Sequence, residues 1–191
     1  DEEHYGIDIV VPDFTYLHEN RDKVRAVFLT HAHEDHVGAL AHLMPALDCP
    51  VYATELTTAM VLSKLEERGQ KVAVDMKVVQ PGAVVQAGAM SVEFVSVAHS
   101  IPETCAMAVR TAHGILLFTT DFRFDFTPVD GKRTDVGRLT ELGKEGVLLL
   151  VSDSTNADRP GWGPSESTVA DGLRQAFLNA QIGRASCRAR L

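Results

Sequence analysis

A short apolar segment that runs straight into a cluster of histidines constrains this chain more than any other feature. Residues 24–30 (VRAVFLT) have the character of a buried strand, and the run HAHEDH at residues 31–36 follows without a break. A strand end that leads into a loop and then a helix is a frequent location of sites in α/β proteins. Clustered imidazoles repel one another when protonated, and a helix start needs only a carboxylate to favour its dipole. We therefore predict a metal site here rather than a set of surface histidines.

The spacing within this run predicts two ions. His31 and His33 are two residues apart in an extended segment, so their side chains point the same way and can bind one ion together. Asp35 and His36 come where the chain turns into a helix, so they point elsewhere and can bind a second ion. Imidazole and carboxylate together suit zinc, with manganese or iron as alternatives.

Two later residues supply the ligand types that the run lacks. His99 follows a predicted strand at residues 91–97, and Asp121 follows another at residues 115–119. Both stand just past the end of a strand, as His31 does. A carboxylate such as Asp121 can bridge two ions about 4 Å apart. Their matching positions predict that both residues join the metal site.

Short β-branched runs alternate with helical patterns along the chain. Strands are predicted at residues 7–11, 24–30, 51–53, 78–79, 84–86, 91–97, 105–111, 115–119 and 147–151, the last as a buried strand followed by a turn at residues 152–156. Helices are predicted at residues 37–47 and 55–68, and after Ser165, which can cap a third helix through Phe177. A β-rich centre between mixed ends favours an α/β fold of layered sheets with helices outside, in one domain.

Composition and charge exclude several classes of protein. The chain has 191 residues, 45% of them hydrophobic, which is enough for one core. A formal charge of −8 argues against a protein that coats nucleic acid, but a nuclease stays open because bound divalent ions add local positive charge. No segment reaches the roughly 20 apolar residues that span a bilayer, so no membrane association is expected.

The three cysteines predict neither a disulfide framework nor a thiolate zinc site. Cys49, Cys105 and Cys187 lie far apart and form no C-x-x-C pair. Cys49 and Cys105 stand in apolar surroundings and are expected to be packed thiols. This cysteine usage favours a reducing, cytoplasmic location.

The segment THAHEDHVGAL at residues 30–40 resembles the H-x-H-x-D-H motif of the metallo-β-lactamase superfamily, and His99 and Asp121 are similar in order and spacing to its later metal-binding motifs. The resemblance implies an αββα layered sandwich and two zinc ions. It further implies the ligand set: one zinc is held by His31, His33 and His99, the other by Asp35 and His36, and Asp121 bridges the two.

Three further stretches, at residues 6–14, 98–103 and 152–161, resemble the ribonuclease J family, which belongs to the β-CASP group. The similarity covers residues 1–179. It implies a zinc-dependent ribonuclease that cuts RNA internally and from the 5′ end, holds RNA in a cleft between two domains, and forms homo-oligomers. Asp35 and Asp121 then act in catalysis through the bound metals and a metal-activated hydroxide, which attacks the phosphodiester.

The same resemblance implies that this chain is an N-terminal fragment. The family's first motif, its β-CASP insertion and a later histidine of the second zinc shell are missing, so we expect residues 1–179 to be a partial domain, weakly active or inactive alone. Residues 180–191 carry Arg184, Arg188 and Arg190 without an acidic residue and have no periodicity. We expect them to be a basic tail that is non-native or unstructured.

Two other functions stay open on the sequence. The superfamily motif alone also fits a small-molecule hydrolase that acts on an ester, a lactone or a thioester. A non-catalytic RNA-binding or scaffold protein is the third class, and the complete set of six ligand residues argues against it.

Overall fold

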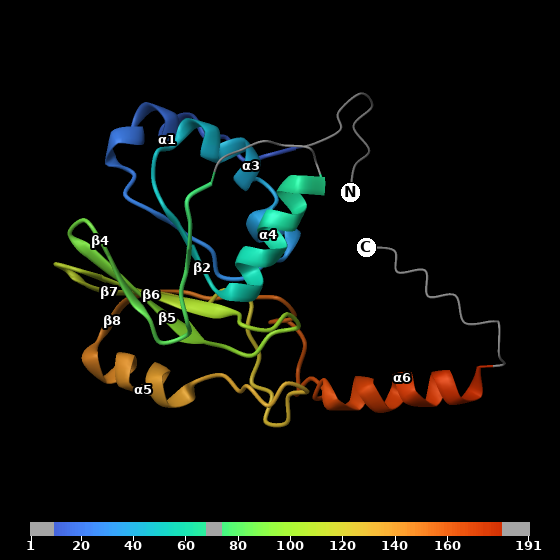
Figure 1. Ribbon diagram of the computed structural model, residues 1–191. Coiled ribbons are helices and arrows are strands. Elements are labelled where there is room, and N and C mark those ends of the chain that lie inside the picture. Colours follow the sequence, from blue (N-terminus) through green and yellow to red (C-terminus); the bar gives the residue numbers. More distant parts are fainter. Residues whose placement is uncertain (1–9, 68–73, 181–191) are drawn as a thin grey trace.

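The computed structural model describes residues 10–67 and 74–180, and these form two facing sheets with helices on the outer sides (Figure 1). The first sheet is parallel and has the order β1 (Val27–Phe28), β2 (Val51–Ala53) and β3 (Met76–Val78). The second sheet has the order β4 (Val84–Ala87), β5 (Met90–Ser96), β6 (Cys105–Thr111), β7 (Gly114–Phe118) and β8 (Val147–Val151). It is antiparallel except for the parallel β7–β8 pair. The predicted layered α/β class is confirmed.

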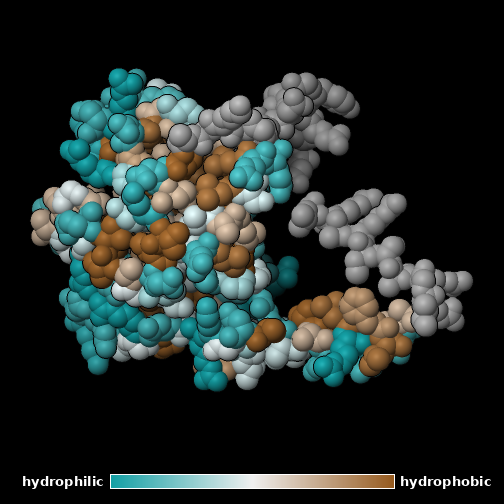
Figure 2. Space-filling model, in the orientation of Figure 1, coloured by the Kyte–Doolittle hydropathy of each residue, from teal (hydrophilic) through white to brown (hydrophobic). Residues whose placement is uncertain are grey.

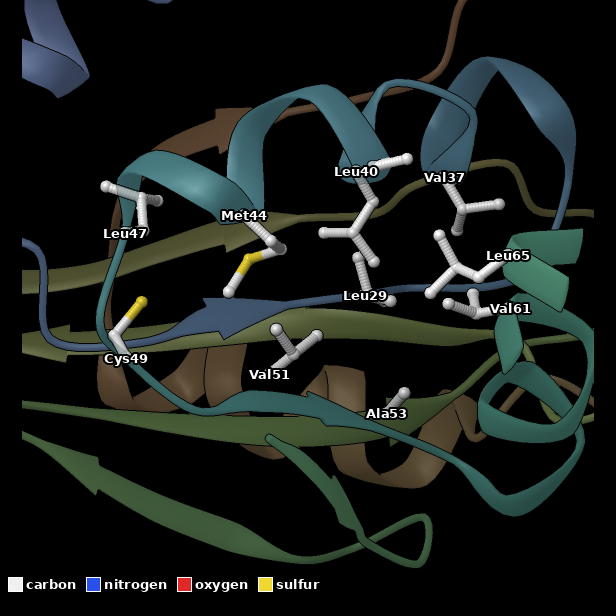
Figure 3. Packing of buried hydrophobic residues seen from close by; sticks show 11 residues of the cluster. Leu29, Val37, Leu40, Met44, Leu47, Cys49, Val51, Ala53, Val61 and Leu65 are labelled. Carbon is white, nitrogen blue, oxygen red and sulfur yellow. The ribbon is translucent and has the colours of Figure 1, made fainter. Parts of the chain in front are cut away.

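Helices cover the outer face of the first sheet. They are α2 (Glu34–Val37), α3 (Leu40–Leu43), the 3-10 turn η2 (Met44–Ala46) and α4 (Glu55–Glu67). Because side chains alternate along a strand, Val51 and Ala53 of β2 point to the helices. Figure 3 shows them packed below Leu40 and Met44, with Val61 of α4 beside them.

The two sheets share an apolar layer between them. Phe28 and Tyr52, which alternate with the helix-facing residues of the first sheet, stack with ring centroids 5.3 Å apart. Phe94 of β5 meets Phe28 from the opposite sheet at 6.0 Å and is fully buried. Cys105 and Met107 of β6 complete this layer. Burial on this scale contributes roughly 1.5–3 kcal/mol for each large side chain.

The outer face of the second sheet packs against α5 (Val136–Glu145) (Figure 1). Leu142 of this helix is fully buried against Val95, Ala106 and Leu117. The helix begins at Asp135, whose carboxylate accepts the backbone N–H of Arg138 at 2.8 Å. Together the four layers give the arrangement that the resemblance implied.

Two elements of the first half are shorter than predicted. Of the predicted strand at residues 24–30, only β1 is a strand, although the backbone N–H of Leu29 still donates to the carbonyl of Tyr52 at 2.9 Å. The predicted helix at residues 37–47 is divided into α2, α3 and η2, and Pro45 inside η2 prevents a continuous helix. Gly38 closes α2 and would place a Cβ 2.5 Å from the carbonyl oxygen of Glu34, so the turn admits no larger residue without a shift.

The strand at residues 147–151 has the predicted bounds, but the prediction that it is buried is wrong. In β8, Leu148, Leu149, Leu150 and Val151 are exposed, because this strand lies at the edge of the second sheet. The last helix, α6 (Ser167–Asn179), projects from the body (Figure 1). Its N-cap residue is Glu166 rather than Ser165, although the Ser165 hydroxyl accepts the Ser167 N–H at 3.3 Å.

Three helical segments were not predicted from the sequence: α5, α1 (Thr15–Glu19) and the 3-10 turn η1 (Arg21–Lys23). The first predicted strand is not observed at Val10 and Val11, and its residues 7–9 lie outside the described residues. Also outside them are Arg68 at the end of the second predicted helix, Cys187, and residues 181–191 of the predicted basic tail. Cys49 and Cys105 are free and buried, which confirms packed thiols. Within the described ranges, no helix is long and apolar enough to cross a membrane.

Candidate metal centre

Three chain segments meet at one edge of the two sheets. The run at residues 31–36 leaves β1, the loop with His99 leaves β5, and the loop with Asp121 leaves β7. The backbone N–H of Cys105 donates to the carbonyl of Thr30 at 3.0 Å, which ties the end of β1 to β6. An isolated bridge pairs Ala98 with Arg123, which holds the two later loops side by side. The sheets therefore bring together residues that are far apart in the sequence.

The first group of candidate ligands has three imidazoles and one carboxylate. His31 Nε2 and His99 Nε2 each lie 3.0 Å from His33 Nδ1. Asp121 Oδ2 lies 3.4 Å from His99 Nε2 and 3.8 Å from His31 Nε2. These four ligand atoms all lie within 4.8 Å of one another.

The second group shares Asp121. Its other oxygen, Oδ1, lies 3.5 Å from His36 Nε2, and Asp35 Oδ2 lies 3.5 Å from the same nitrogen. This group is more open to solvent than the first, since Asp35 is largely exposed. The structure thus brings all six sequence-predicted residues together. His31 and His33 lie in one group and Asp35 and His36 in the other, as the spacing predicted, and His99 and Asp121 lie where the resemblance implied.

Burial favours the neutral form of two imidazoles in the first group, those of His31 and His99. Burial, reinforced by the neighbouring His36, His99 and His33, lowers the pKa of His31 to about 3. Burial also lowers the pKa of His99, although Asp121 acts in the opposite direction. Neutral imidazoles have a free lone pair, which is the form that binds a metal.

The donor set of this site fits metal ions. His33 Nδ1 lies 3.0 Å from the Nε2 atoms of both His31 and His99, and one ring proton cannot bridge both contacts. Lone pairs of these ring nitrogens therefore point to the same place. A cation at that point satisfies all of them at once. The two oxygens of Asp121 face different groups, which is the arrangement of a bridging carboxylate.

Three residues around the ligands were not singled out from the sequence. The hydroxyls of Thr30 and Thr120 lie 3.1 Å and 3.4 Å from His31 Nδ1. Lys64 of α4 pairs with Glu34 at 2.5 Å and reaches the carbonyl of Ala32 at 3.4 Å. No sequence pattern marks these contacts, because they join segments that only the fold brings together.

A turn follows β8 as predicted, but it lies at residues 155–158 and only overlaps the predicted range 152–156. The Asp153 carboxylate accepts the N–H of Thr155 at 2.9 Å and its hydroxyl at 2.8 Å. These hydrogen bonds, led by the backbone N–H, lower the pKa of Asp153. Its own N–H donates to Thr119 at 3.1 Å, which fastens the turn beside the loop of Asp121.

The fold is that of a metallo-β-lactamase-type domain, and its site holds two groups of candidate metal ligands that share Asp121. The model of the metallo-beta-lactamase superfamily matches residues 6–149, and the chain belongs to this superfamily. A crystal structure of a protein of unknown function from Enterococcus faecalis V583 has the same fold, with a TM-score of 0.62 and 24% identity over 81% of this chain and 39% of that chain.

Among curated proteins, the chain is similar to several named ribonuclease J. It is 42% identical to ribonuclease J of Helicobacter pylori over 93% of this chain and 26% of that protein. It is 40% identical to ribonuclease J of Synechocystis over 93% of this chain and 28% of that protein. It is 39% identical to ribonuclease J2 of Bacillus subtilis over 92% of this chain and 32% of that protein. The chain therefore spans about a quarter to a third of the length of these relatives.

These comparisons confirm the predicted class, a metal-dependent hydrolase domain similar to part of ribonuclease J. They do not favour the alternative of a small-molecule ester, lactone or thioester hydrolase.

Proposed function

We propose that this chain is the metal-binding part of a zinc-dependent ribonuclease that hydrolyses RNA phosphodiester bonds, both internally and from the 5′ end. The observation that carries the proposal is the position of Asp121, whose two oxygens face two separate groups of ligands. The choice of RNA rests on the similarity to proteins named ribonuclease J. Residues 1–179 then form a partial domain of a larger enzyme.

Each of the six residues has a proposed role. His31, His33 and His99 hold the first zinc, Asp35 and His36 hold the second, and Asp121 bridges them. Manganese is the alternative metal, because imidazole and carboxylate ligands also suit it. When bound, the two ions polarise a phosphodiester and activate water for its attack.

The protein itself contributes orientation and charge. The buried, neutral imidazole of His31 fixes the inner side of the site. Asp35 and His36 keep the outer side open, where a phosphodiester of an RNA chain can reach. The formal charge of −8 disfavours RNA binding by the chain as a whole, and two bound divalent ions would supply positive charge where the phosphate lies.

We expect this chain to cut RNA slowly on its own. Within the part of the chain that the structure describes, the second group consists of Asp35, His36 and Asp121, without the later histidine that the resemblance implies for the second zinc. One side of that group is also exposed.

We further propose that the complete enzyme is located in the cytoplasm and forms a homo-oligomer.

The test compares an RNA substrate with a simple ester. The zinc-loaded chain, in excess over substrate, is incubated with a 5′-monophosphorylated RNA oligonucleotide and with a nitrophenyl ester, with Asp121→Ala as the inactive control. We expect slow, chelator-sensitive RNA cleavage that Asp121→Ala abolishes, and no ester hydrolysis. Ester hydrolysis without RNA cleavage would contradict the proposal. RNA turnover as fast as that of the complete Helicobacter pylori relative would contradict the expected weak activity.

A further inference from the structure

Thr120, the residue before Asp121, has an unusual backbone. Its φ is +53°, in the left-handed region. A β-branched residue is strongly disfavoured there, whereas glycine adopts this conformation freely. Among the described residues, the other non-glycine residues with positive φ are Glu103 and Asn156, and neither is β-branched. A threonine at this position therefore requires a compensating interaction.

The compensating interaction lies on the inner side of the metal centre. The Thr120 hydroxyl donates to Thr30 Oγ1 at 3.0 Å and lies 3.4 Å from His31 Nδ1. Thr30 Oγ1 in turn lies 3.1 Å from the same nitrogen. Two hydroxyl oxygens thus face the ring nitrogen of His31 that points away from the other ligands.

This contact decides which nitrogen of His31 carries the proton. His31 Nε2 faces His33 and Asp121, so it must have a free lone pair to bind a metal. The proton then sits on Nδ1, where the oxygens of Thr30 and Thr120 can accept it. Hydrogen bonds of this kind set the tautomer and the ring orientation of metal-binding histidines.

The same residue also sets the direction of Asp121. The left-handed turn at Thr120, two residues after the end of β7, carries Asp121 toward the ligands, and the Thr119 hydroxyl donates to the Thr120 carbonyl at 3.0 Å. Glycine would permit the turn but could not reach His31. A threonine combines both tasks in one residue.

We propose that Thr120 is a positioning residue that couples the bridging carboxylate of Asp121 to the buried imidazole of His31. The inference rests on the proposed metal centre and is independent of RNA as the substrate. The inference depends on two features of Thr120: it is a β-branched residue in the left-handed region, and its hydroxyl is directed at His31 Nδ1.

Three substitutions separate the hydroxyl from the backbone. Thr120→Ser keeps the hydroxyl, Thr120→Val keeps the shape but removes it, and Thr120→Gly removes it and relieves the backbone. Thr58→Val is the matched control, because the Thr58 hydroxyl is buried without a hydrogen-bond partner among the described residues. Zinc affinity is measured by competition with a chromophoric chelator, and the thermal midpoint is measured on the metal-free chain.

We expect Thr120→Ser and Thr58→Val to bind zinc as the unsubstituted chain does, and Thr120→Val and Thr120→Gly to bind it about tenfold or more weakly. Despite equal loss of affinity, Thr120→Gly should unfold roughly 2–4 °C above Thr120→Val, because only glycine relieves the left-handed strain. If Thr120 had only a structural role, zinc affinity would follow stability, and Thr120→Gly would bind zinc more tightly than Thr120→Val.

A spectroscopic readout is independent of metal. Long-range ¹H–¹⁵N spectra of the metal-free chain should show the proton of His31 on Nδ1 in the unsubstituted chain and in Thr120→Ser, and a mixture of tautomers in Thr120→Val. Unchanged zinc affinity in Thr120→Gly or Thr120→Val would overturn the inference, and so would weak binding by Thr120→Ser. Failure of the unsubstituted chain to bind zinc is a separate result, which would overturn the metal centre itself and this inference with it.

Discussion

At the scale of single residues, the candidate ligands could be predicted from the sequence, whereas the residues that contact them could not. His31, His33, Asp35 and His36 lie in one short run, so their spacing alone assigned them to two groups. His99 and Asp121 were found from their positions after strands. Thr120 and Lys64 act through contacts across the fold, with a separation of 89 residues between Thr120 and His31, and no local pattern carries such information.

We expect Lys64 of α4 to hold the segment at residues 31–36 in place. Its ammonium group pairs with Glu34 at 2.5 Å and contacts the carbonyl of Ala32, in the middle of the run. Replacement by methionine (Lys64→Met) should weaken zinc binding by roughly tenfold in chelator competition. Stability should fall by no more than about 1 kcal/mol, because both partners are partly exposed.

Lys77→Met is the matched control for this prediction. Lys77 of β3 pairs at 2.8 Å with Asp75, the residue before this strand. Neither residue belongs to the metal centre. Its replacement should leave zinc affinity unchanged. Equal zinc affinities of Lys64→Met and Lys77→Met would contradict the role of Lys64.

At the scale of elements, strands were predicted better than helices. The bounds of β6 and β8 were predicted as observed, since runs of β-branched and apolar residues between turns mark strands clearly. The prediction of one continuous helix at residues 37–47 was wrong, because Gly38 ends α2 and Pro45 lies in η2. For α5, Asp135 at the N-cap is a helix-start signal in the sequence, although no helix was predicted there.

The junction of α5 and the second sheet depends on one buried carboxylate. Glu93 of β5 is buried and accepts from Arg138 of α5 at 2.6 Å and 3.0 Å. Glu93→Gln should reduce the free energy of unfolding by about 2–3 kcal/mol, somewhat below the roughly 3–5 kcal/mol of a fully buried pair, because Arg138 is partly exposed. Urea denaturation measures the change.

The control for the Glu93 prediction is Glu141→Gln. Glu141 pairs with the same Arg138 at 2.7 Å but is exposed, so its loss should cost about 0–1 kcal/mol. A Glu93→Gln variant as stable as Glu141→Gln would show that this ion pair does not hold α5 to the sheet.

The start of α6 is expected to loosen in acid. The Asp125 carboxylate accepts the backbone N–H groups of Glu166 and Thr127, both at 2.9 Å. These hydrogen bonds, with the N–H of Glu166 first, lower the pKa of Asp125. A lowered pKa means that the unfolded chain binds more protons, so this stability is complete above the ordinary carboxyl pKa of about 3.9 and is lost as the pH falls through the lower folded value.

Urea denaturation at pH 7 and at pH 3 measures this effect. Asp125→Asn should be less stable than the unsubstituted chain at pH 7 and should lose less stability between the two pH values. Equal losses in both proteins would contradict the assignment to Asp125.

At the scale of the whole molecule, the layered fold was predictable, but the burial of its edges was not. The sequence of β8 is apolar throughout, and a buried strand is the usual interpretation of such a run. In the structure, Leu148 and Leu150 are 62% and 57% exposed. Figure 2 shows a further apolar surface along α6, where Val169, Leu173 and Phe177 are exposed. The order of strands in a sheet, which places β8 at an edge, cannot be read from a single strand.

An exposed apolar edge strand favours association between chains. The double substitution Leu148→Lys with Leu150→Lys should reduce self-association in sedimentation velocity, with a change in stability within about 0.5 kcal/mol, as is usual at exposed positions. Association at the same protein concentration in the variant and the unsubstituted chain would contradict this expectation.

The central claim is that two groups of ligands, joined by Asp121, hold two ions. Equilibrium dialysis against zinc, followed by elemental analysis, tests it most directly. The account predicts two zinc ions for each unsubstituted chain, at most one in Asp121→Ala, and two in the distant control Asp158→Asn, whose side chain lies at an exposed position. Absence of bound zinc in the unsubstituted chain, or two ions in Asp121→Ala, would contradict it.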